Sequence, residues 1–152
     1  MTTSETVRDW IENYSFIGKI YQSVEHQKIP VSLDAQNRLR ASPDTDALEL
    51  IFLYHSSTPG RLNFLLRRLH QRHETIDISP NNVLTAYPDR AHTGFFKLQP
   101  LAWRARSLRC LWRDQHGNPI KRALQTAADL AKPSLLTIGQ GQECEYLVEQ
   151  IN

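Results

Sequence analysis

The chain has 152 residues, a length that suits one domain with a buried core. Hydrophobic residues make up 40% of it and charged residues 22%, which is the ordinary composition of a globular protein. No apolar run approaches the roughly 18 residues of a transmembrane helix, and the first residues, MTTSETVRDW, lack the basic start and apolar centre of a signal peptide. We therefore expect a cytoplasmic protein with no membrane partner.

Positive charge is concentrated in the middle of the chain, although the net charge is only +2. Residues 1–60 sum to −3, from five Lys/Arg and eight Asp/Glu, and residues 123–152 also sum to −3, from one and four. Residues 61–122 sum to +8, from twelve Lys/Arg and four Asp/Glu. A basic middle suits an anionic partner: a small anionic ligand, a nucleic acid or an acidic protein. The same distribution of charge also arises when the arginines only cover the solvent-exposed faces of helices and strands and bind no partner.

The first part of the chain predicts a helix and then a hairpin. Apolar residues keep helical spacing over residues 4–27, which indicates one long amphipathic helix. Residues 31–33 and 38–40 alternate between apolar and polar on either side of four turn-forming residues, 34–37. This pattern predicts a β-hairpin.

Residues 44–78 carry the densest apolar run and are predicted to be the structural centre of the chain. The almost wholly apolar residues 47–54 predict a buried helix. Thr58 and Pro59 suit the start of a second helix, because proline lacks only an N–H that the first turn does not need. Four leucines share one face of that helix at spacings of three and four residues: Leu62, Leu65, Leu66 and Leu69. Residues 75–78 alternate as a short strand.

The remaining residues predict several strands and one more helix. Residues 83–87 alternate as a strand, and residues 88–94 are expected to form an exposed loop before a further strand at 95–98. Residues 101–118 fit either a helix or a strand. We favour a strand over 106–113, because three apolar side chains alternate there: Leu108, Cys110 and Trp112.

The C-terminal part predicts a helix over 118–131 and a closing strand or helix near 146–151. Together, the elements predict an α+β fold in which N-terminal helices pack on a small antiparallel sheet. They fit a single domain that spans residues 1–152.

Common catalytic and metal-binding motifs are missing from the sequence. It contains no GxSxG, P-loop or HExxH motif and no GxGxxG after a strand. His70 and His73 have HxxH spacing, but no third zinc ligand accompanies them. Cys110 and Cys144 form no metal-ligand pattern, and we expect both to be reduced, buried thiols. We predict neither a metal nor a cofactor.

Two segments resemble a known enzyme family. FLYHSSTPGRL followed by ETIDI is similar to the entry region of the chorismate lyase (4-hydroxybenzoate synthetase) superfamily, which includes the ligand-sensing domains of GntR-type repressors. Residues 106–112, leading to Gly117-Asn118-Pro119, are similar in order and distance to the family's arginine-bearing strand and hairpin. The resemblance covers roughly residues 45–122 in short pieces. It implies that the chain binds, or binds and cleaves, a small anionic ring compound such as chorismate or an aromatic acid.

The resemblance also implies roles for particular residues. Arg106 would take part in catalysis, and Arg109 and Arg61 would bind the ligand, because a guanidinium holds a carboxylate with two hydrogen bonds. The family uses a late acidic residue, which no position here matches cleanly. Glu145 is the candidate for this acid, and Glu143 is the alternative. One way of pairing this sequence with the family places Gln125 at the position of the acid.

Two other functions fit the same residues. The first three predicted helices and the 88–94 loop have the order of a winged helix that binds nucleic acid. Four arginines would then face phosphates: Arg61, Arg68, Arg72 and Arg90. A non-enzymatic protein-interaction adaptor is the third possibility, and it predicts an exposed apolar patch.

Overall fold

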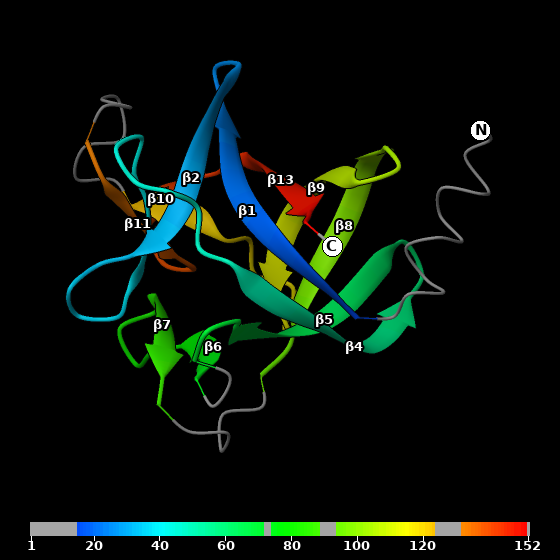
Figure 1. Cartoon of the computed structure of the whole chain (residues 1–152), viewed down its shortest axis with the longest axis horizontal. Coiled ribbons are helices and arrows are strands. Elements are labelled where there is room, and N and C mark those ends of the chain that lie inside the picture. Colours follow the sequence, from blue (N-terminus) through cyan, green and yellow to red (C-terminus); the bar gives the residue numbers. More distant parts are fainter. Residues whose placement is uncertain (1–14, 72–73, 89–93, 124–131, 152) are drawn as a thin grey trace.

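The computed structural model describes residues 15–71, 74–88, 94–123 and 132–151. These residues form thirteen antiparallel strands and no helix (Figure 1), so the predicted α+β class is wrong and the fold of this part of the chain is all-β. The strands are β1 (Phe16–Val24), β2 (Gln27–Leu33), β3 (Leu39–Ala41), β4 (Leu50–Thr58), β5 (Arg61–Arg68), β6 (Thr75–Ile78), β7 (Leu84–Tyr87), β8 (Phe96–Trp103), β9 (Ser107–Asp114), β10 (Lys121–Ala123), β11 (Ser134–Thr137), β12 (Gly141–Gln142) and β13 (Glu145–Gln150).

Six strands form a closed ring. β1 pairs with β13, β13 with β9, β9 with β8, β8 with β5, β5 with β4, and β4 again with β1. Closure pairs the backbone groups that an open sheet leaves exposed at its edges. The ring therefore stabilises the part of the molecule that carries β8, β9 and β13.

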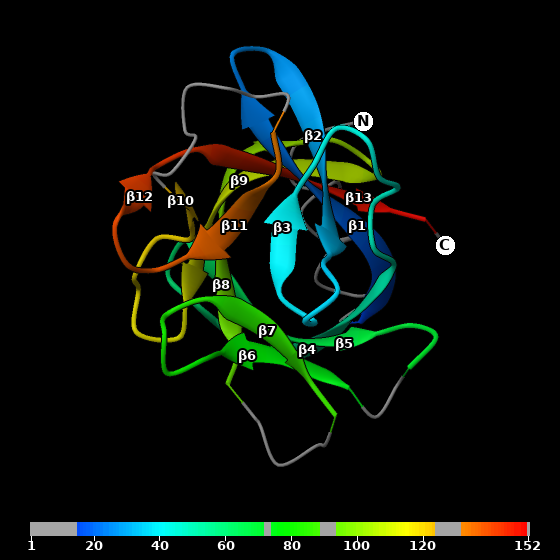
Figure 2. The same ribbon diagram turned by 90° about the vertical axis from the view of Figure 1, so that its left-hand side faces the viewer.

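Two extensions leave the ring and meet each other. β2, β3, β11, β10 and β12 continue the sheet from β1, and β6 and β7 continue it from β5. Two isolated bridges join the β7 segment to the other extension. Thr85 of β7 pairs with Arg38, and Val83, just before β7, pairs with Thr137 of β11. β7 accordingly lies beside β11 in Figure 2.

Side chains that alternate along the ring strands build the core. Phe16 and Phe52 stack with their ring centres 4.5 Å apart, and Phe64 meets Phe16 edge-on at 5.5 Å. Trp112 and Tyr146 form a second edge-to-face pair at 5.1 Å. Such geometries are the favoured ones for aromatic pairs. The period of two in burial is what a strand with one buried face requires.

The two predicted central helices are the β4–β5 hairpin. Ile51, Leu53 and Leu65 point away from the core and are half-buried, so the apolar run reflects a strand covered in part on both faces rather than a buried helix. Gly60 has a φ of 75°, and it turns the chain where Thr58 and Pro59 predicted a helix start. Pairing along the whole hairpin outweighs the local helical spacing of the leucines.

The predicted helix over 4–27 is also wrong where the structure describes it, because residues 16–24 form β1. The predicted helix over 118–131 is wrong at residues 121–123, which form β10, and residues 124–131 lie outside the described residues. The winged-helix arrangement of the nucleic-acid hypothesis is therefore wrong as well, since its second and third helices are strands.

Several strand predictions are confirmed. The hairpin of 31–40 is β2 and β3, and the strands at 75–78 and 83–87 are β6 and β7. The favoured strand at 106–113 is β9, and the C-terminal segment adopts the strand alternative as β13. In most of these segments buried positions recur at every second residue.

Candidate anion-binding site

Three cations share the outer face of β5, β8 and β9. Lys97 pairs with Arg113 across β8 and β9, and on its other side it pairs with Asn63 of β5. Arg61 lies two residues before Asn63, so its side chain leaves β5 on the same face. None of the three cations forms an ion pair among the described residues.

The side chains of Arg61 and Arg113 converge on Gly117. Arg113 donates from Nε to Gln99 Oε1 over 3.1 Å and from Nη1 to the Gly117 carbonyl over 3.1 Å. A Cβ atom placed on Gly117 would lie 3.6 Å from Arg61 Nη1. Two guanidinium groups thus approach the same residue, and neither forms an ion pair with an acid of the described residues, an arrangement that an anion stabilises.

The turn that carries Gly117 is built by Asp114. The Asp114 carboxylate accepts hydrogen bonds from the backbone N–H groups of His116 and Asn118 and from the Asn118 side chain, at 2.8–3.0 Å. Gly117 has a φ of 89°, which a residue with a Cβ adopts at a cost. The sequence Asp-Gln-His-Gly-Asn therefore fixes the carbonyl that holds Arg113.

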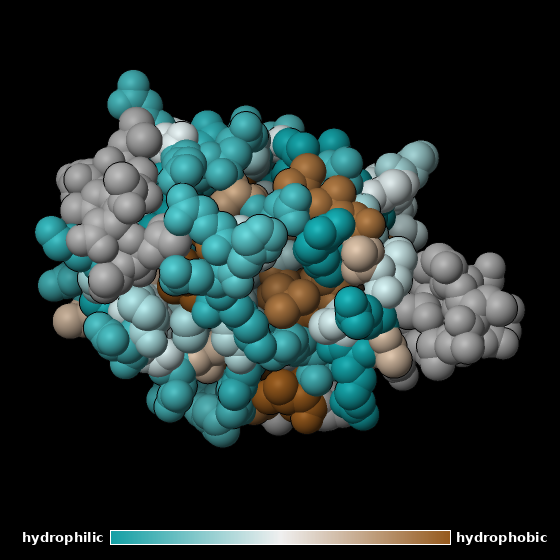
Figure 3. Space-filling model, turned by 90° about the horizontal axis from the view of Figure 1, so that it is seen from above, coloured by the Kyte–Doolittle hydropathy of each residue, from teal (hydrophilic) through white to brown (hydrophobic). Residues whose placement is uncertain are grey.

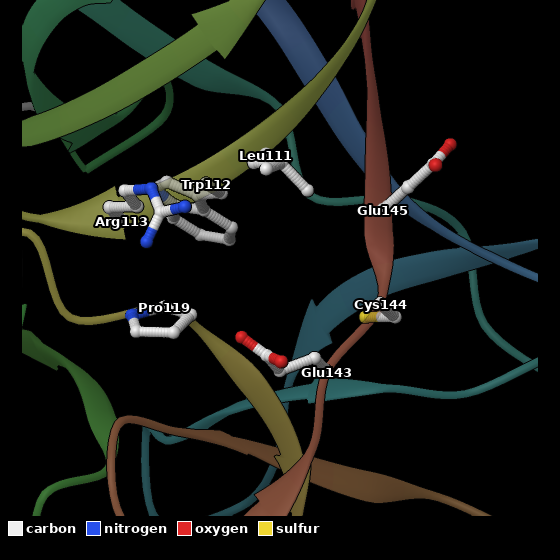
Figure 4. A pocket seen from close by; sticks show the side chains of 7 residues that line it. All are labelled: Leu111, Trp112, Arg113, Pro119, Glu143, Cys144 and Glu145. Carbon is white, nitrogen blue, oxygen red and sulfur yellow. The ribbon is translucent and has the colours of Figure 1, made fainter. Parts of the chain in front are cut away.

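A hollow of about 290 Å³ lies beside Arg113, between β9 and the segment that enters β13. In Figure 4 the Arg113 side chain lies at one side of it, and the Glu143 carboxylate points toward Pro119 from the other, whereas Glu145 points away. Leu111 and Pro119 contribute apolar surface between the charges. The hollow therefore offers a cation at one end, an acceptor at the other and an apolar middle. It is lined by Leu111, Trp112, Arg113, Pro119, Glu143, Cys144 and Glu145.

A polar network lies in the interior behind Cys144. Arg122, Gln22 and Tyr146 are each fully buried. Arg122 Nη1 donates to Gln22 Oε1, Gln22 Nε2 donates to the Tyr146 hydroxyl over 3.2 Å, and that hydroxyl donates to the Ile120 carbonyl over 3.0 Å. Within the described part of the chain, Nε and Nη2 of Arg122 have no hydrogen-bond partner.

Two titratable groups beside Arg122 stay neutral at neutral pH. Burial raises the pKa of the Cys144 thiol from 9.0 to about 11, and the hydrogen bond with Tyr146 and the charge of Arg122 offset this only in part. Burial also raises the pKa of Tyr146 well above 10.0. Neither group supplies the negative charge that a buried guanidinium needs.

The residues predicted from the family resemblance do not surround one cavity. Arg106 is exposed in the β8–β9 turn, where its carbonyl accepts from the Gln150 N–H over 2.8 Å. Arg109 forms a 3.6 Å ion pair with Glu145, and both side chains are about half exposed, at 53% and 44%. Arg109 borders a separate hollow of about 370 Å³, and Arg61 borders another of about 290 Å³. Glu145 and Glu143 line the hollow beside Arg113.

The arginines of the nucleic-acid hypothesis are similarly divided. Arg61 and Arg68 stand at opposite ends of β5, roughly 23 Å apart at the rise of a strand. Arg68 is occupied by an ion pair with Glu74 at 3.0 Å. Arg72 and Arg90, like Gln125 of the lyase hypothesis, lie outside the described residues.

Sequence reasoning missed Lys97, Arg113 and Arg122 as members of a site. Arg113 follows Arg109 by four residues, so a strand places both on one face, and this alternation is the signal that identifies it. Lys97 becomes a neighbour only through the pairing of β8 with β9. No local signal distinguishes Arg122 from a surface arginine.

The chain has no match among protein-family models and no significant match among curated proteins. No group of three or more His, Cys, Asp or Glu side chains in the described ranges is arranged to hold a metal ion. The described residues also include no helix of the length and apolarity that crossing a membrane requires. A function for this chain therefore rests on the geometry of its own side chains.

Proposed function

We propose that the chain binds a small carboxylate that also carries a hydrogen-bond donor, such as an aromatic hydroxy acid, in the hollow beside Arg113. The observation that supports this proposal is the convergence of Arg61 and Arg113 on Gly117 without an acid partner among the described residues. The proposal concerns binding. Cleavage of the ligand is not part of it, because Glu145 is half exposed and points away from the hollow.

Each wall of the hollow has a separate task in this proposal. Arg113 receives the carboxylate, and its two hydrogen bonds to Gln99 and Gly117 hold the guanidinium in place before the ligand arrives. Arg61 and Lys97 do not line this hollow, but they add positive charge on the same face of the sheet, where Lys97 pairs with Arg113. Glu143 accepts a hydrogen bond from a hydroxyl at the far end of the ligand, and the ring of the ligand packs on Leu111 and Pro119.

The size of the hollow limits the ligand to about one ring. Its volume of about 290 Å³ is at the lower end of ligand pockets, which span roughly 300–1,000 Å³. A second ring or a long chain would extend into solvent. The acid on the far wall further disfavours a second carboxylate, so a monocarboxylate with a hydroxyl group fits better than a dicarboxylate such as chorismate.

Calorimetry with 4-hydroxybenzoate, benzoate and 4-hydroxybenzamide tests the proposal. The hydroxy acid should bind most tightly, because benzoate lacks the donor for Glu143 and the amide lacks the charge for Arg113. Arg113→Gln should weaken binding of 4-hydroxybenzoate by about 1.5–3 kcal/mol, roughly 10- to 150-fold, which is the worth of a charge-assisted hydrogen bond.

Arg38→Gln is the matched control, because Arg38 pairs with Asp34 at 2.8 Å in the β2–β3 hairpin, away from β8 and β9. It should bind 4-hydroxybenzoate as the wild type does. Equal affinity of Arg113→Gln, Arg61→Gln and the wild type would place any binding elsewhere.

Binding of single-stranded nucleic acid is a second candidate for the same face. Arg109, with 53% of its side chain exposed, continues the line of positive charge along β9 from Arg113. Each phosphate contact would lower the slope of log K against log salt concentration by about 0.7. An oligonucleotide titration at several salt concentrations checks this, and a slope near zero would exclude the nucleic-acid candidate.

An adaptor function finds less support on the surface. Among the described residues, only two large hydrophobic side chains are classed as exposed, Leu101 at 41% and Ile151 at 42%. On the face shown in Figure 3, apolar areas are separated by hydrophilic side chains. Scattered apolar residues of this kind are normal on soluble proteins.

A further inference from the structure

The charge of Arg122 lies in the interior, and no residue in the described part of the chain forms an ion pair with it. The side chain is 0% exposed, and within the described ranges it donates a hydrogen bond to the neutral amide of Gln22. No carboxylate of the described residues lies within ion-pair distance of it. A buried charge that is neither paired nor fully hydrogen-bonded is costly.

The groups that surround Arg122 cannot neutralise it. The Tyr146 hydroxyl is engaged with Gln22 and Ile120, and the pKa values of Tyr146 and Cys144 are both raised by burial. Gln22, Tyr146 and Cys144 are therefore uncharged at neutral pH. None of these three described residues cancels the positive field of Arg122, and in a medium of low dielectric that field extends farther than it would in water.

Arg122 lies close behind the wall of the hollow. It pairs with Gln142 across β10 and β12, and Cys144, two residues after Gln142, lines the hollow. The same Cys144 lies near enough to Arg122 to feel its charge. Arg122 itself does not line the hollow, so its charge can reach a bound anion only through the wall to which Cys144 belongs.

We infer that Arg122 is a specificity-determining residue of the hollow, which favours anionic over neutral ligands through its unpaired buried charge. This inference rests on the proposed function. Arg113 contacts the carboxylate directly, whereas Arg122 acts through the wall and touches no ligand atom. It also offsets Glu143 and Glu145, which would otherwise repel a carboxylate from this hollow.

The first test is the ratio of affinities for 4-hydroxybenzoate and 4-hydroxybenzamide. Arg122→Met, which keeps length and removes charge, should lower this ratio about tenfold at low salt, whereas Arg122→Lys should keep most of it. An equal loss of affinity for both ligands in Arg122→Met would mean that Arg122 has only a structural role, and would overturn the inference. The proposed function itself fails in a different way, namely if the wild type binds neither compound.

The second test leaves Arg122 in place and supplies the missing charge. Cys144→Asp puts a carboxylate where the wall meets the guanidinium, and Cys144→Asn is the neutral control of the same shape. If Arg122 lacks a counter-ion, the Asp variant should be more stable to urea than the Asn variant at pH 7, and it should lose the preference for 4-hydroxybenzoate over the amide. An Asp variant that is less stable than the Asn variant would overturn the inference, whatever the ligands do.

Discussion

Replacing Gly18 with alanine should destabilise the fold at the position where the six-stranded ring closes. Gly18 pairs with Gln150 of β13 on one side and with Leu50 of β4 on the other. A Cβ atom at this position would lie 2.8 Å from the Glu149 carbonyl oxygen, 3.0 Å from the Phe16 ring and 3.1 Å from the Phe52 ring. The rings can tilt, but the carbonyl belongs to a paired strand, so β1 or β13 has to shift.

The expected magnitude follows from two opposing terms. Alanine restricts the unfolded chain and would by itself stabilise the protein by about 0.4–1 kcal/mol. Overpacking a core costs about 1–3 kcal/mol. The overpacking should win, so we expect a net loss of about 1–2 kcal/mol, or a decrease in Tm of roughly 2–8 °C for a chain of this size.

Urea unfolding followed by tryptophan fluorescence measures this loss. The slope m should stay unchanged, because the native and unfolded surfaces are the same. Gly60→Asn is the matched control: a Cβ atom at Gly60 has no neighbour within 4 Å, and asparagine tolerates its φ of 75°. The control should stay within about 0.5 kcal/mol of the wild type. A Gly18→Ala variant as stable as this control would refute ring closure at β1.

Three further predictions concern the buried network and the turns. Tyr146→Phe leaves the Ile120 carbonyl and the Gln22 amide without their partner, so urea unfolding should show a loss of about 1–3 kcal/mol. Burial raises the pKa of Cys144 from 9.0 to about 11, so at pH 7.5 it should hold about a hundredfold less thiolate than an unperturbed thiol. Mass spectrometry should therefore find Cys144 unmodified at a time when iodoacetamide has fully alkylated a reference peptide. Burial raises the pKa of Asp34, but hydrogen bonds from Arg38 and Gln36 outweigh this effect and bring the pKa below 3.8. The stability that Asp34 contributes is therefore present above pH 3.8 and is lost as the pH falls below that value. The acid-unfolding curve of Asp34→Asn should lack this loss.

The short strands were predictable because their sequence alternates and their turns are local. Residues 31–40 are an example: Asp34 Oδ1 accepts from the N–H groups of Gln36 and Arg38, so the turn is specified by residues that are adjacent in sequence. The Leu108, Cys110 and Trp112 alternation predicted β9 for the same reason. In these segments local preference and tertiary pairing agree.

The ring strands β1, β4 and β5 were mistaken for helices because their inner faces are not wholly apolar or their outer faces are not wholly polar. In β1 the buried positions include Gly18 and Gln22, which break the alternating apolar pattern, while Ile17 and Tyr21 lie outside and restore a helical spacing. In β4 the outer positions Ile51 and Leu53 are apolar too. Periodicity alone cannot separate a strand of this kind from a buried helix.

The same limit explains why the site was only partly predicted. Arg61 was predicted as a ligand-binding residue and lies on the same face as Lys97 and Arg113, but Arg113 comes from a strand 52 positions later, and only the ring brings Arg61 and Arg113 together at Gly117. Charge density along the chain showed only that the middle third is basic. Which cations share a face depends on strand pairing, which the sequence does not display. Arg122 is the clearest example, because its buried surroundings include Gln22 and Tyr146, which lie 100 and 24 residues away in the sequence. Replacing a buried polar group by an apolar one of similar volume is often neutral or stabilising, so the polar side chains of this interior could not be expected from the needs of a core alone.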